Sequence, residues 1–593
     1  EYGLYLFRVS DENGMFDKTV RFSVCNPPED GVKNSKLGAD TDFDEGYRGT
    51  PSVNMPLISK AGFGIVREAF SWRNSDKDKT GAKLTERHSD FVERAQENNI
   101  NISALVSGGN TAYTSESPPK SDDAIAAYAD YCGWLAALLK GKAEYTEVWN
   151  EYMLNGFNID NLPPEDYARL LIASYCAIKK ADPDMKVSAF SLPGFSDTVL
   201  SGSVGGLSSK EWLRRVLTYL DENNALDCFD VVSAHPYTET CMPDDGGIMK
   251  QKYDELISVL AEYGKENTPI VATEIGWSTQ NAFTDRKRQA NALLRQAVTN
   301  EAYDMYEKMI IYVFQCYSHS AADREANFGI INTFDGDCPN TARPAYVALC
   351  NYNRIMSGAK FKGIVSKDAD TVYKFENKNG GTTYVMWNKD GKSRLKLADD
   401  SVYGTLCDMY GNEKTVYSKN GIYDIEIDEN TSYLIVPKNQ AAITDISNRY
   451  SENSDYKKLF VKADAPYTVI FKDEDNITPM NREDVSISLY CETNVVGGAR
   501  LDAICNDENA ELVWEFKSGN SNEFERLAND KDYFIIDNAH TDGYIRVRTA
   551  DGTAVSAAVY TEPLQNVFKE WRADLPMVEK APDNLLFTCD GKT

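Results

Sequence analysis

The sequence is short of positive charge and of long apolar runs. Its 593 residues include 63 Lys and Arg against 91 Asp and Glu, which gives a formal net charge of −28. Nucleic-acid phosphates and anionic membrane surfaces are bound through Lys and Arg, so this deficit argues against both kinds of partner. No uninterrupted apolar stretch approaches the roughly 18 residues that a membrane-spanning helix needs, and we expect no membrane span.

Histidine is also scarce, which limits the metal chemistry open to the chain. Four histidines occur, and no two of them stand at a metal-ligand spacing such as His-x-x-x-His. No glycine-rich loop ends in Gly-Lys-Ser or Gly-Lys-Thr, so phosphate groups have no cradle of that type. We therefore predict neither a metal centre nor a cofactor. The twelve cysteines are scattered along the chain, and we expect mostly free thiols.

What the sequence does contain is the composition of an ordinary globular protein, with 42% apolar and 26% charged residues. Its length suggests three or so domains. Shifts in residue pattern divide the chain into four segments. These are an N-terminal β-hairpin with a linker (1–28), a (β/α)8 barrel (29–358), a β-sandwich (359–440) and a C-terminal β-rich domain of carbohydrate-binding or immunoglobulin-like type (441–593).

The central segment alternates short apolar runs with amphipathic helical stretches. This arrangement is typical of parallel sheets built through helical crossovers. Eight apolar runs lie between about residues 36 and 358, which predicts an α/β fold of the TIM-barrel type. The eight predicted strands cover residues 37–43, 63–70, 102–107, 145–150, 186–192, 229–234, 269–273 and 309–315.

The flanking segments have the short spacing of β-structure. Residues 2–9 read as a strand, and the Asn13-Gly14 step favours a hairpin turn over 11–14. Two strands alone are marginal in water, so we expect this hairpin to pair with another β-domain. After Gly358 the helical periodicity stops and strand patterns begin. Because the first strand has no preceding start, we also expect a longer precursor that carried an export signal.

Two glutamates follow buried strands of the predicted barrel. Glu151 ends the segment Trp149-Asn150-Glu151 after the fourth run, and Glu274 follows the seventh run. In such barrels the C-terminal ends of the strands carry the reacting groups. Two carboxylates that face each other across the barrel mouth are what retaining glycoside hydrolysis requires, because one protonates the leaving oxygen and the other attacks the anomeric carbon.

The order of these motifs resembles that of clan A glycoside hydrolases, and the span 36–358 looks most like the family 39 type. The resemblance implies that Glu151 is the acid/base and Glu274 the nucleophile of a retaining enzyme. The motifs that carry it are Arg67-Glu68 and Ser71-Trp72 after strand two, Gly108-Gly109-Asn110 after strand three, Trp149-Asn150-Glu151, Thr273-Glu274, and Ala342-Arg343-Pro344-Ala345-Tyr346 in the last helix.

The same resemblance implies roles for residues around the pair. Asn150 would hydrogen-bond the sugar 2-hydroxyl, Arg67 would keep the nucleophile anionic and oriented, and Tyr237 would bond to the nucleophile from strand six. His235 and Asn110 are expected to line the site. The aromatic rings that we expect to stack on sugar faces are those of Trp72, Trp277 and Tyr317.

The chain departs from the family pattern in two places. Tyr152 stands where clan members often have proline, and strand eight has Tyr312 and Tyr317 where a tryptophan is usual. These positions shape subsites more than they touch the chemistry, so they bear on the substrate rather than on the mechanism. A non-catalytic carbohydrate-binding protein on a degenerate barrel is the alternative of a different class.

The expected partner is a poly- or oligosaccharide. Loops 107–123, 194–210 and 237–249 are long enough to build a groove, which favours internal cleavage of a β-glucan, a xylan or a related glycan. The alternative is an exo-acting enzyme of the β-xylosidase kind, which needs a groove closed at one end. We expect the protein to degrade polysaccharide outside the cell or at its surface.

Overall fold

The computed structural model describes most of the chain up to residue 438 and separate stretches of the remainder. Up to 438 it leaves out residues 1, 11–16, 30, 45, 47, 76–80, 239, 281–283, 336–338, 402 and 420. Beyond 438 it describes 459–464, 495–496, 500–505, 511–518, 521, 523–529, 531, 533–550 and 558–562. The predicted turn at 11–14 therefore lies outside the described residues. Among the described helices, none is long and apolar enough to cross a bilayer.

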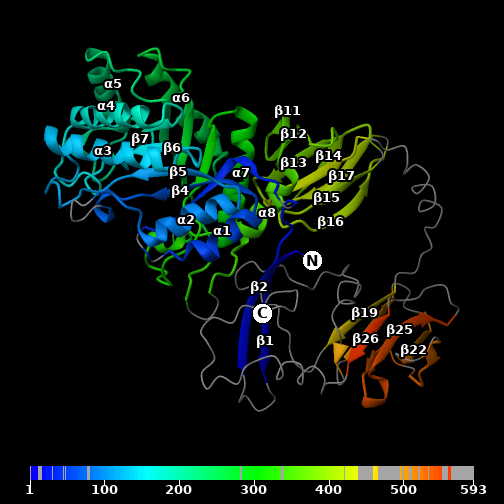
Figure 1. The fold of residues 1–593 in the computed structure, drawn as a ribbon. Helices are drawn as coiled ribbons and strands as arrows, with labels where there is room; N and C mark the ends of the chain where they lie inside the picture. Colours follow the sequence, from blue (N-terminus) through cyan, green and yellow to red (C-terminus); the bar gives the residue numbers. More distant parts are fainter. Residues whose placement is uncertain are drawn as a thin grey trace, which may run out of the picture.

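Eight parallel strands close into a barrel in the order β10-β3-β4-β5-β6-β7-β8-β9, and helices surround it (Figure 1). This confirms the predicted TIM barrel. The strands are β3 (Asn34–Asp40), β4 (Phe63–Ala69), β5 (Asn101–Val106), β6 (Ala143–Val148), β7 (Lys186–Pro193), β8 (Val231–His235), β9 (Ile270–Ile275) and β10 (Lys308–Ile311). The helices are α1 (Pro51–Lys60), α2 (Glu86–Glu97), α3 (Asp122–Leu138), α4 (Pro164–Ala181), α5 (Ser209–Glu222), α6 (Ile248–Ala261), α7 (Arg286–Tyr303) and α8 (Pro344–Met356).

Each predicted strand overlaps an observed one, but the first and last strands end earlier than predicted. β3 ends at Asp40 because the following backbone leaves the ladder: the amides of Phe43 and Asp44 donate to the Glu68 carboxylate at 2.9 and 2.8 Å. β10 stops at Ile311. The chain beyond both strands therefore forms loops at the barrel mouth.

The barrel interior is built in layers. The lowest layer is apolar and fully buried, and it joins alternate strands β4, β6, β8 and β10, as in other barrels of this type. Its members are Ile65, Tyr145, Val231 and Ile310, packed with Val271 of β9. Because strand side chains alternate between two faces, the residue two positions later faces the same interior. In β4 and β6 these are Arg67 and Glu147, so the next layer is charged.

A β-sandwich packs beside α7 and α8 (Figure 1). A two-stranded sheet lies on a six-stranded one, and apolar side chains from both form a common core. The six-stranded sheet has the order β11 (Lys360–Lys367), β12 (Asp370–Glu376), β13 (Thr382–Asn388), β18 (Ser432–Val436), β15 (Tyr403–Cys407) and β16 (Glu413–Tyr417). The other sheet pairs β14 (Ser393–Ala398) with β17 (Ile422–Ile427).

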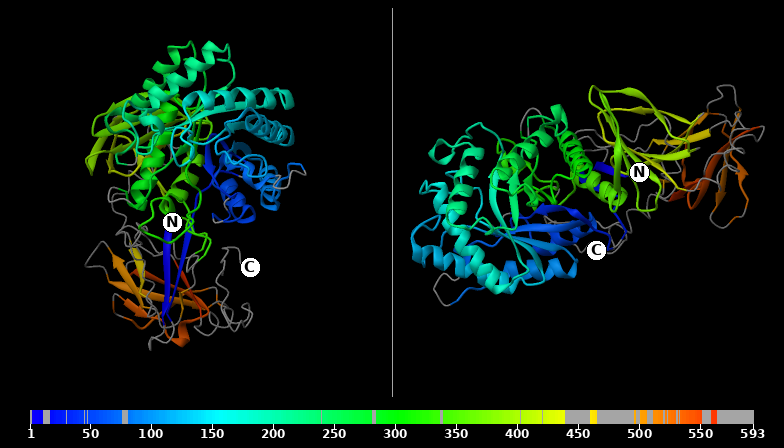
Figure 2. Two further views of the ribbon diagram at one scale, coloured as in Figure 1. Left: turned by 90° about the vertical axis from the view of Figure 1, so that its left-hand side faces the viewer. Right: turned by 90° about the horizontal axis from the view of Figure 1, so that it is seen from above.

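The N-terminal strands β1 (Gly3–Ser10) and β2 (Asp17–Val24) form a hairpin that stands out from the barrel (Figures 1 and 2). Within the described strands it forms a sheet of its own, and its link to the sandwich is a pair of hydrogen bonds between the Tyr2 backbone and the Asn412 side chain, at 2.7 and 2.9 Å. The eight described cysteines are free thiols.

The described strands of the C-terminal segment form two further sheets. One has three strands in the order β19 (Leu459–Asp464), β21 (Arg500–Cys505) and β24 (Tyr533–Ile535). The other has five strands in the order β20 (Val495–Val496), β26 (Val559–Glu562), β25 (Gly543–Thr549), β22 (Leu512–Ser518) and β23 (Glu525–Arg526). The segment is therefore β-structured where the structure describes it.

Candidate active site

The chain turns sharply after β6. Trp149 and Glu151 have φ values of 63° and 40°, a left-handed conformation that non-glycine residues seldom adopt. Such strain costs about 1–3 kcal/mol per residue and persists only where the surroundings fix it. Here the Trp149 amide donates to the Val106 carbonyl at 2.8 Å, and the Trp149 indole donates to the Phe157 carbonyl at 2.9 Å. The turn places Glu151 at the barrel mouth.

The two predicted glutamates meet at this mouth. One carboxylate oxygen of Glu151, one of Glu274 and a ring nitrogen of His235 all lie within 4.8 Å of one another. Retaining glycosidases hold their carboxyl groups about 5–5.5 Å apart, whereas inverting enzymes need about 6.5–9.5 Å to admit a water molecule. The separation in this structure falls on the retaining side.

Arg67 connects four acceptors around the pair. Its Nη1 donates to Glu274 at 2.7 Å and to Asp40 at 2.9 Å, its Nε donates to Glu147 at 2.7 Å, and its Nη2 donates to the Asn150 side-chain oxygen at 2.9 Å. The guanidinium is buried, so these charge-assisted bonds are poorly screened. Arg67 therefore holds Glu274 and Asn150 in fixed positions relative to one another.

Glu147 is a buried member of the site to which the sequence analysis gave no role. It accepts from Arg67, from the Ser191 hydroxyl at 2.7 Å and from the Thr273 hydroxyl at 3.1 Å. Burial alone raises its pKa, but the charges of Arg67 and His235 and the hydrogen bonds from Ser191 and Arg67 hold the pKa below its ordinary value. The signal that could have identified it is its position two residues after Tyr145 in an inward-facing strand pattern.

Asp40 is the second acidic residue that the sequence analysis did not assign. Burial raises the pKa of its carboxyl to about 8, although Arg67 lowers it, and the charges of Glu274 and Asp42 add to the increase. One guanidinium faces the three carboxyls of Asp40, Glu147 and Glu274, so the site favours a proton on one of them. Asp40 is the one that the burial and charge balance favour.

His235 and Tyr237, at the end of β8, contact the two glutamates. His235 Nδ1 lies 2.7 Å from a Glu151 oxygen, and the Tyr237 hydroxyl donates to Glu274 at 2.9 Å. Burial raises the pKa of Glu151, His235 lowers it and the charge of Glu274 raises it, with a net increase. Burial lowers the pKa of His235, but Glu274 and Glu151 raise it above its ordinary value. The His235–Glu151 pair thus favours holding a proton.

The predicted sugar-stacking rings are placed differently from one another. Trp72 and Trp277 are 1% and 0% exposed, so neither ring has an open face, and the Trp277 indole donates to the Cys241 carbonyl at 3.2 Å. This packing does not favour sugar stacking by these two rings. Tyr317 is half-buried, its hydroxyl donates to Asp323, and the Arg48 guanidinium lies 4.9 Å from the centre of its ring.

Asn110 organises a loop, and its polar atoms are directed to the backbone. Its amide nitrogen donates to the carbonyls of Trp72 and Ser75 at 2.9 and 2.8 Å, and its oxygen accepts from the Ala112 amide at 3.0 Å. The side chain is 1% exposed. These contacts tie the loop after β5 to the loop after β4, and they engage both the nitrogen and the oxygen of the Asn110 amide group.

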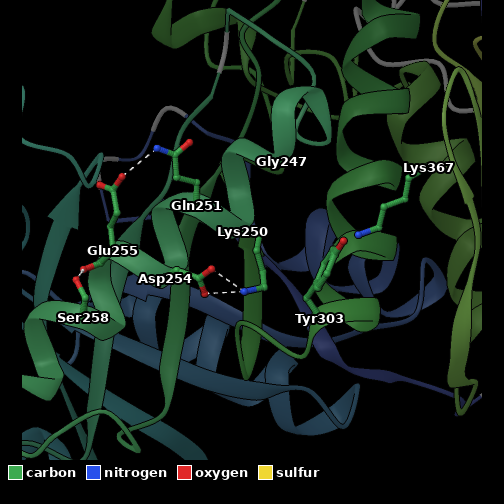
Figure 3. Close-up of a pocket in the computed structure, with 8 residues that line it drawn as sticks. All are labelled: Gly247, Lys250, Gln251, Asp254, Glu255, Ser258, Tyr303 and Lys367. Carbon is green, nitrogen blue, oxygen red and sulfur yellow. Dashed lines mark hydrogen bonds and ion pairs between the residues drawn. The ribbon is translucent and has the colours of Figure 1, made fainter.

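A separate cavity of about 630 Å³ lies on the outer side of α6, between that helix, the end of α7 and β11 (Figure 3). It is lined by Gly247, Lys250, Gln251, Asp254, Glu255, Ser258, Tyr303 and Lys367. Several of its charged groups are paired, for example Lys250 with Asp254 at 2.6 Å. None of the predicted site residues lines this cavity. Among the described residues, the group with metal-ligand spacing is Glu151, His235 and Glu274 itself.

The fold matches solved structures of family 39 glycoside hydrolases. A family 39 enzyme from Bacteroides cellulosilyticus WH2 covers 74% of this chain and 88% of its own, with 21% identity and a TM-score of 0.61. A family 39 β-xylosidase from Caulobacter crescentus covers 70% of this chain and 98% of its own, with 12% identity and a TM-score of 0.51. No protein-family model and no curated protein matches the sequence. At these identities the likeness shows a common fold, which confirms the predicted resemblance at that level.

Proposed function

We propose that this chain is a retaining β-glycoside hydrolase in which Glu274 is the nucleophile and Glu151 the acid/base. The observation that carries the proposal is the spacing of at most 4.8 Å between their nearest oxygens, with Arg67 on Glu274 and His235 on Glu151. A nucleophile needs to be anionic and an acid needs to be protonated. The Arg67 guanidinium lies 2.7 Å from Glu274, and the raised pKa of Glu151, caused by burial, favours the protonated acid.

The proposed reaction takes place in two displacements. Glu274 attacks the anomeric carbon while Glu151 gives its proton to the leaving glycosidic oxygen, which forms a glycosyl-enzyme ester and releases the aglycone. Esterification removes the negative charge of Glu274, so the pKa of Glu151 falls and the group is left as a carboxylate. Glu151 then takes a proton from a water molecule that attacks the same carbon, which frees Glu274 and gives a product of retained configuration.

The substrate is proposed to be a poly- or oligosaccharide that is cleaved internally, since long loops follow β5, β7 and β8 on the mouth face. The second candidate is removal of single sugars from a chain end, because a neighbour of similar fold is described as a β-xylosidase. Sizing the products from β-glucan and xylan separates these two modes: internal cleavage gives oligomers of mixed length, and end-cleavage gives one monosaccharide. We further propose an extracellular or cell-surface location, where such polymers occur.

A mechanism-based 2-deoxy-2-fluoro glycoside tests the chemistry directly. This reagent slows the second displacement more than it prevents the first, so the glycosyl-enzyme accumulates. Mass spectrometry of a proteolytic digest should find the sugar on the peptide that contains Glu274. The absence of an adduct across xylosyl, glucosyl and other common sugars would contradict the proposal and favour a non-catalytic carbohydrate-binding protein.

A further inference from the structure

The loop between β8 and α6 is attached to the β-sandwich through one buried carboxylate. The Trp387 indole of β13 donates to Asp244 at 3.0 Å, and Lys389 lies 3.7 Å from the same oxygen. From α7, Arg295 donates to the other Asp244 oxygen at 3.4 Å. The Asp244 side chain is 4% exposed and Trp387 is fully buried. A buried charge is costly unless it is paired, so Asp244 depends on donors that the sandwich supplies.

The sandwich residues at this contact also bind a residue of the barrel helix α7. The Arg295 guanidinium lies 5.1 Å from the centre of the Trp387 ring and donates to the Glu429 carbonyl at 2.6 Å. Arg295 therefore contacts the loop carboxylate and two segments of the sandwich at once. Movement of the sandwich would change the position of Asp244 as well.

The same loop begins at the residue that bonds to the proposed nucleophile. Tyr237 donates to Glu274, and its carbonyl accepts from Lys252 of α6 at 2.9 Å. Further along the loop, the Cys241 carbonyl accepts from Trp277, which lies three residues after Glu274. The Asp244 contact is the third attachment point. A hydroxyl group on a loop keeps a productive geometry only if such supporting contacts hold the loop to within about 0.5 Å.

We propose that Asp244 and Trp387 are positioning residues through which the β-sandwich holds the Tyr237 hydroxyl against Glu274. The inference rests on the proposed function, since it gives the sandwich a part in setting the nucleophile. The positioning role proposed for these two residues also differs from a purely structural role. Contacts that only join the two domains would affect stability, whereas these contacts should affect turnover through Tyr237.

The test is a double-mutant cycle that combines Trp387→Phe with Tyr237→Phe. Trp387→Phe removes the indole N–H and keeps an aromatic ring beside Arg295. Acting alone, it should lower kcat about tenfold with KM changed less than about twofold. In the Tyr237→Phe background the same change should lower kcat less than about twofold, because the group that it positions is already absent. Equal losses in both backgrounds, or no loss in either, would overturn the proposal.

The matched control is Asn291→Ala, at the same junction of α7 and the sandwich. Asn291 accepts from the Thr431 amide at 2.9 Å and donates to Asn430 at 3.0 Å. This variant should lose a similar amount of thermal stability and keep kcat within about twofold. If Asn291→Ala lowered kcat as much as Trp387→Phe does, the contact would be general domain support and the proposal would be wrong.

An exchange measurement keeps the inference separate from the proposed function. Amide hydrogens of residues 236–247 should exchange faster in Trp387→Phe than in wild type or in Asn291→Ala, because the loop has lost an attachment point. Unchanged exchange overturns the inference even if the protein is an active glycosidase. Faster exchange in a protein without turnover keeps the loop attachment and overturns the proposed function. If Trp387→Phe does not fold, Asp244→Ala, which removes the oxygen that accepts from the indole, replaces it in every arm.

Discussion

The two inner layers of the barrel use the same strands for opposite purposes. In the lower layer, β4 and β6 contribute Ile65 and Tyr145, which are buried among other apolar side chains. Two residues further along the same strands, Arg67 and Glu147 form an ion pair at 2.7 Å. The packed hydrophobic layer and the charged layer are thus only two residues apart along each of these strands.

The difference shows where stability and chemistry are separated in this fold. The apolar layer gains free energy by removing surface from water, at about 25 cal/mol per Å². The charged layer gains little net stability, because removing ions from water offsets most of their attraction. Its charges remain because they orient Glu274 and Asn150. Changes in the upper layer should therefore reduce turnover, and changes in the lower layer should reduce stability alone.

The largest expected effect is that of Glu274→Gln in the upper part of the barrel. Removal of the proposed nucleophile should lower kcat by more than about 10⁴-fold, since no covalent intermediate can form. The amide keeps the size of the side chain, so the unfolding midpoint should change little. Steady-state kinetics and thermal unfolding measure the two quantities. Residual turnover above one hundredth of the wild-type value would contradict the assignment.

Replacing the proposed acid should have a smaller effect that depends on the leaving group. Glu151→Ala should lower kcat/KM by about 10²–10⁴-fold on glycosides with poor leaving groups and far less on aryl glycosides with good ones. Azide should restore part of the rate, because it can attack the glycosyl-enzyme without a general base. Equal loss on both kinds of glycoside, with no effect of azide, would show that Glu151 has another role.

The two layers are compared most directly by Arg67→Met and Ile310→Ala. Arg67→Met leaves Glu147 and Glu274 without their cation and should cost about 3–5 kcal/mol of unfolding free energy. Ile310→Ala opens a cavity and should cost about 2–5 kcal/mol. Only the first variant should also lose turnover, because only it disturbs Glu274. The comparison fails if Ile310→Ala lowers kcat as strongly as Arg67→Met does. Chemical denaturation and kinetics below the unfolding transition check both parts.

The last prediction concerns stability alone, as a pH dependence that comes from Asp40. Burial raises its pKa to about 8 in the folded chain, against about 3.9 when unfolded. Between these values the folded state holds a proton that the unfolded state has lost. The stabilisation is therefore complete below about pH 4 and is lost as the pH rises through about 8. Asp40→Asn removes this contribution, so its unfolding free energy should fall less over that window. Parallel stability curves for variant and wild type would show that Asp40 does not titrate there.

The sequence was sufficient to predict the barrel and the pair of glutamates. Short apolar runs alternate regularly with amphipathic helical stretches, and this pattern predicts the barrel. Glu151 and Glu274 follow two of these runs. Arg67 and Tyr237 contact Glu274, as the family resemblance implied, and His235, which was expected to line the site, contacts Glu151. Their roles in binding and catalysis remain predictions.

Side-chain direction and long-range electrostatics could not be predicted in the same way. Trp72 and Trp277 were expected to face a sugar, but a ring beside a strand end packs inward as readily as outward, and here both are buried. Asp40 and Glu147 were not assigned a role, because their importance comes from one arginine on another strand. Asn110 lies in the expected loop, but its amide nitrogen bonds to backbone carbonyls of the loop after β4.

The fourfold contact of Arg67 also limits how this mouth could be rebuilt in an evolving or engineered protein. Its acceptors belong to β3, to β6 and the turn after it, and to β9, and Arg67 itself belongs to β4. If one strand–helix unit were replaced by that of a relative, its residue in this cluster would therefore meet partners on the other three units that had not changed with it. Loops of such a barrel can be exchanged singly, but the four units around this guanidinium would have to be exchanged together to keep its contacts.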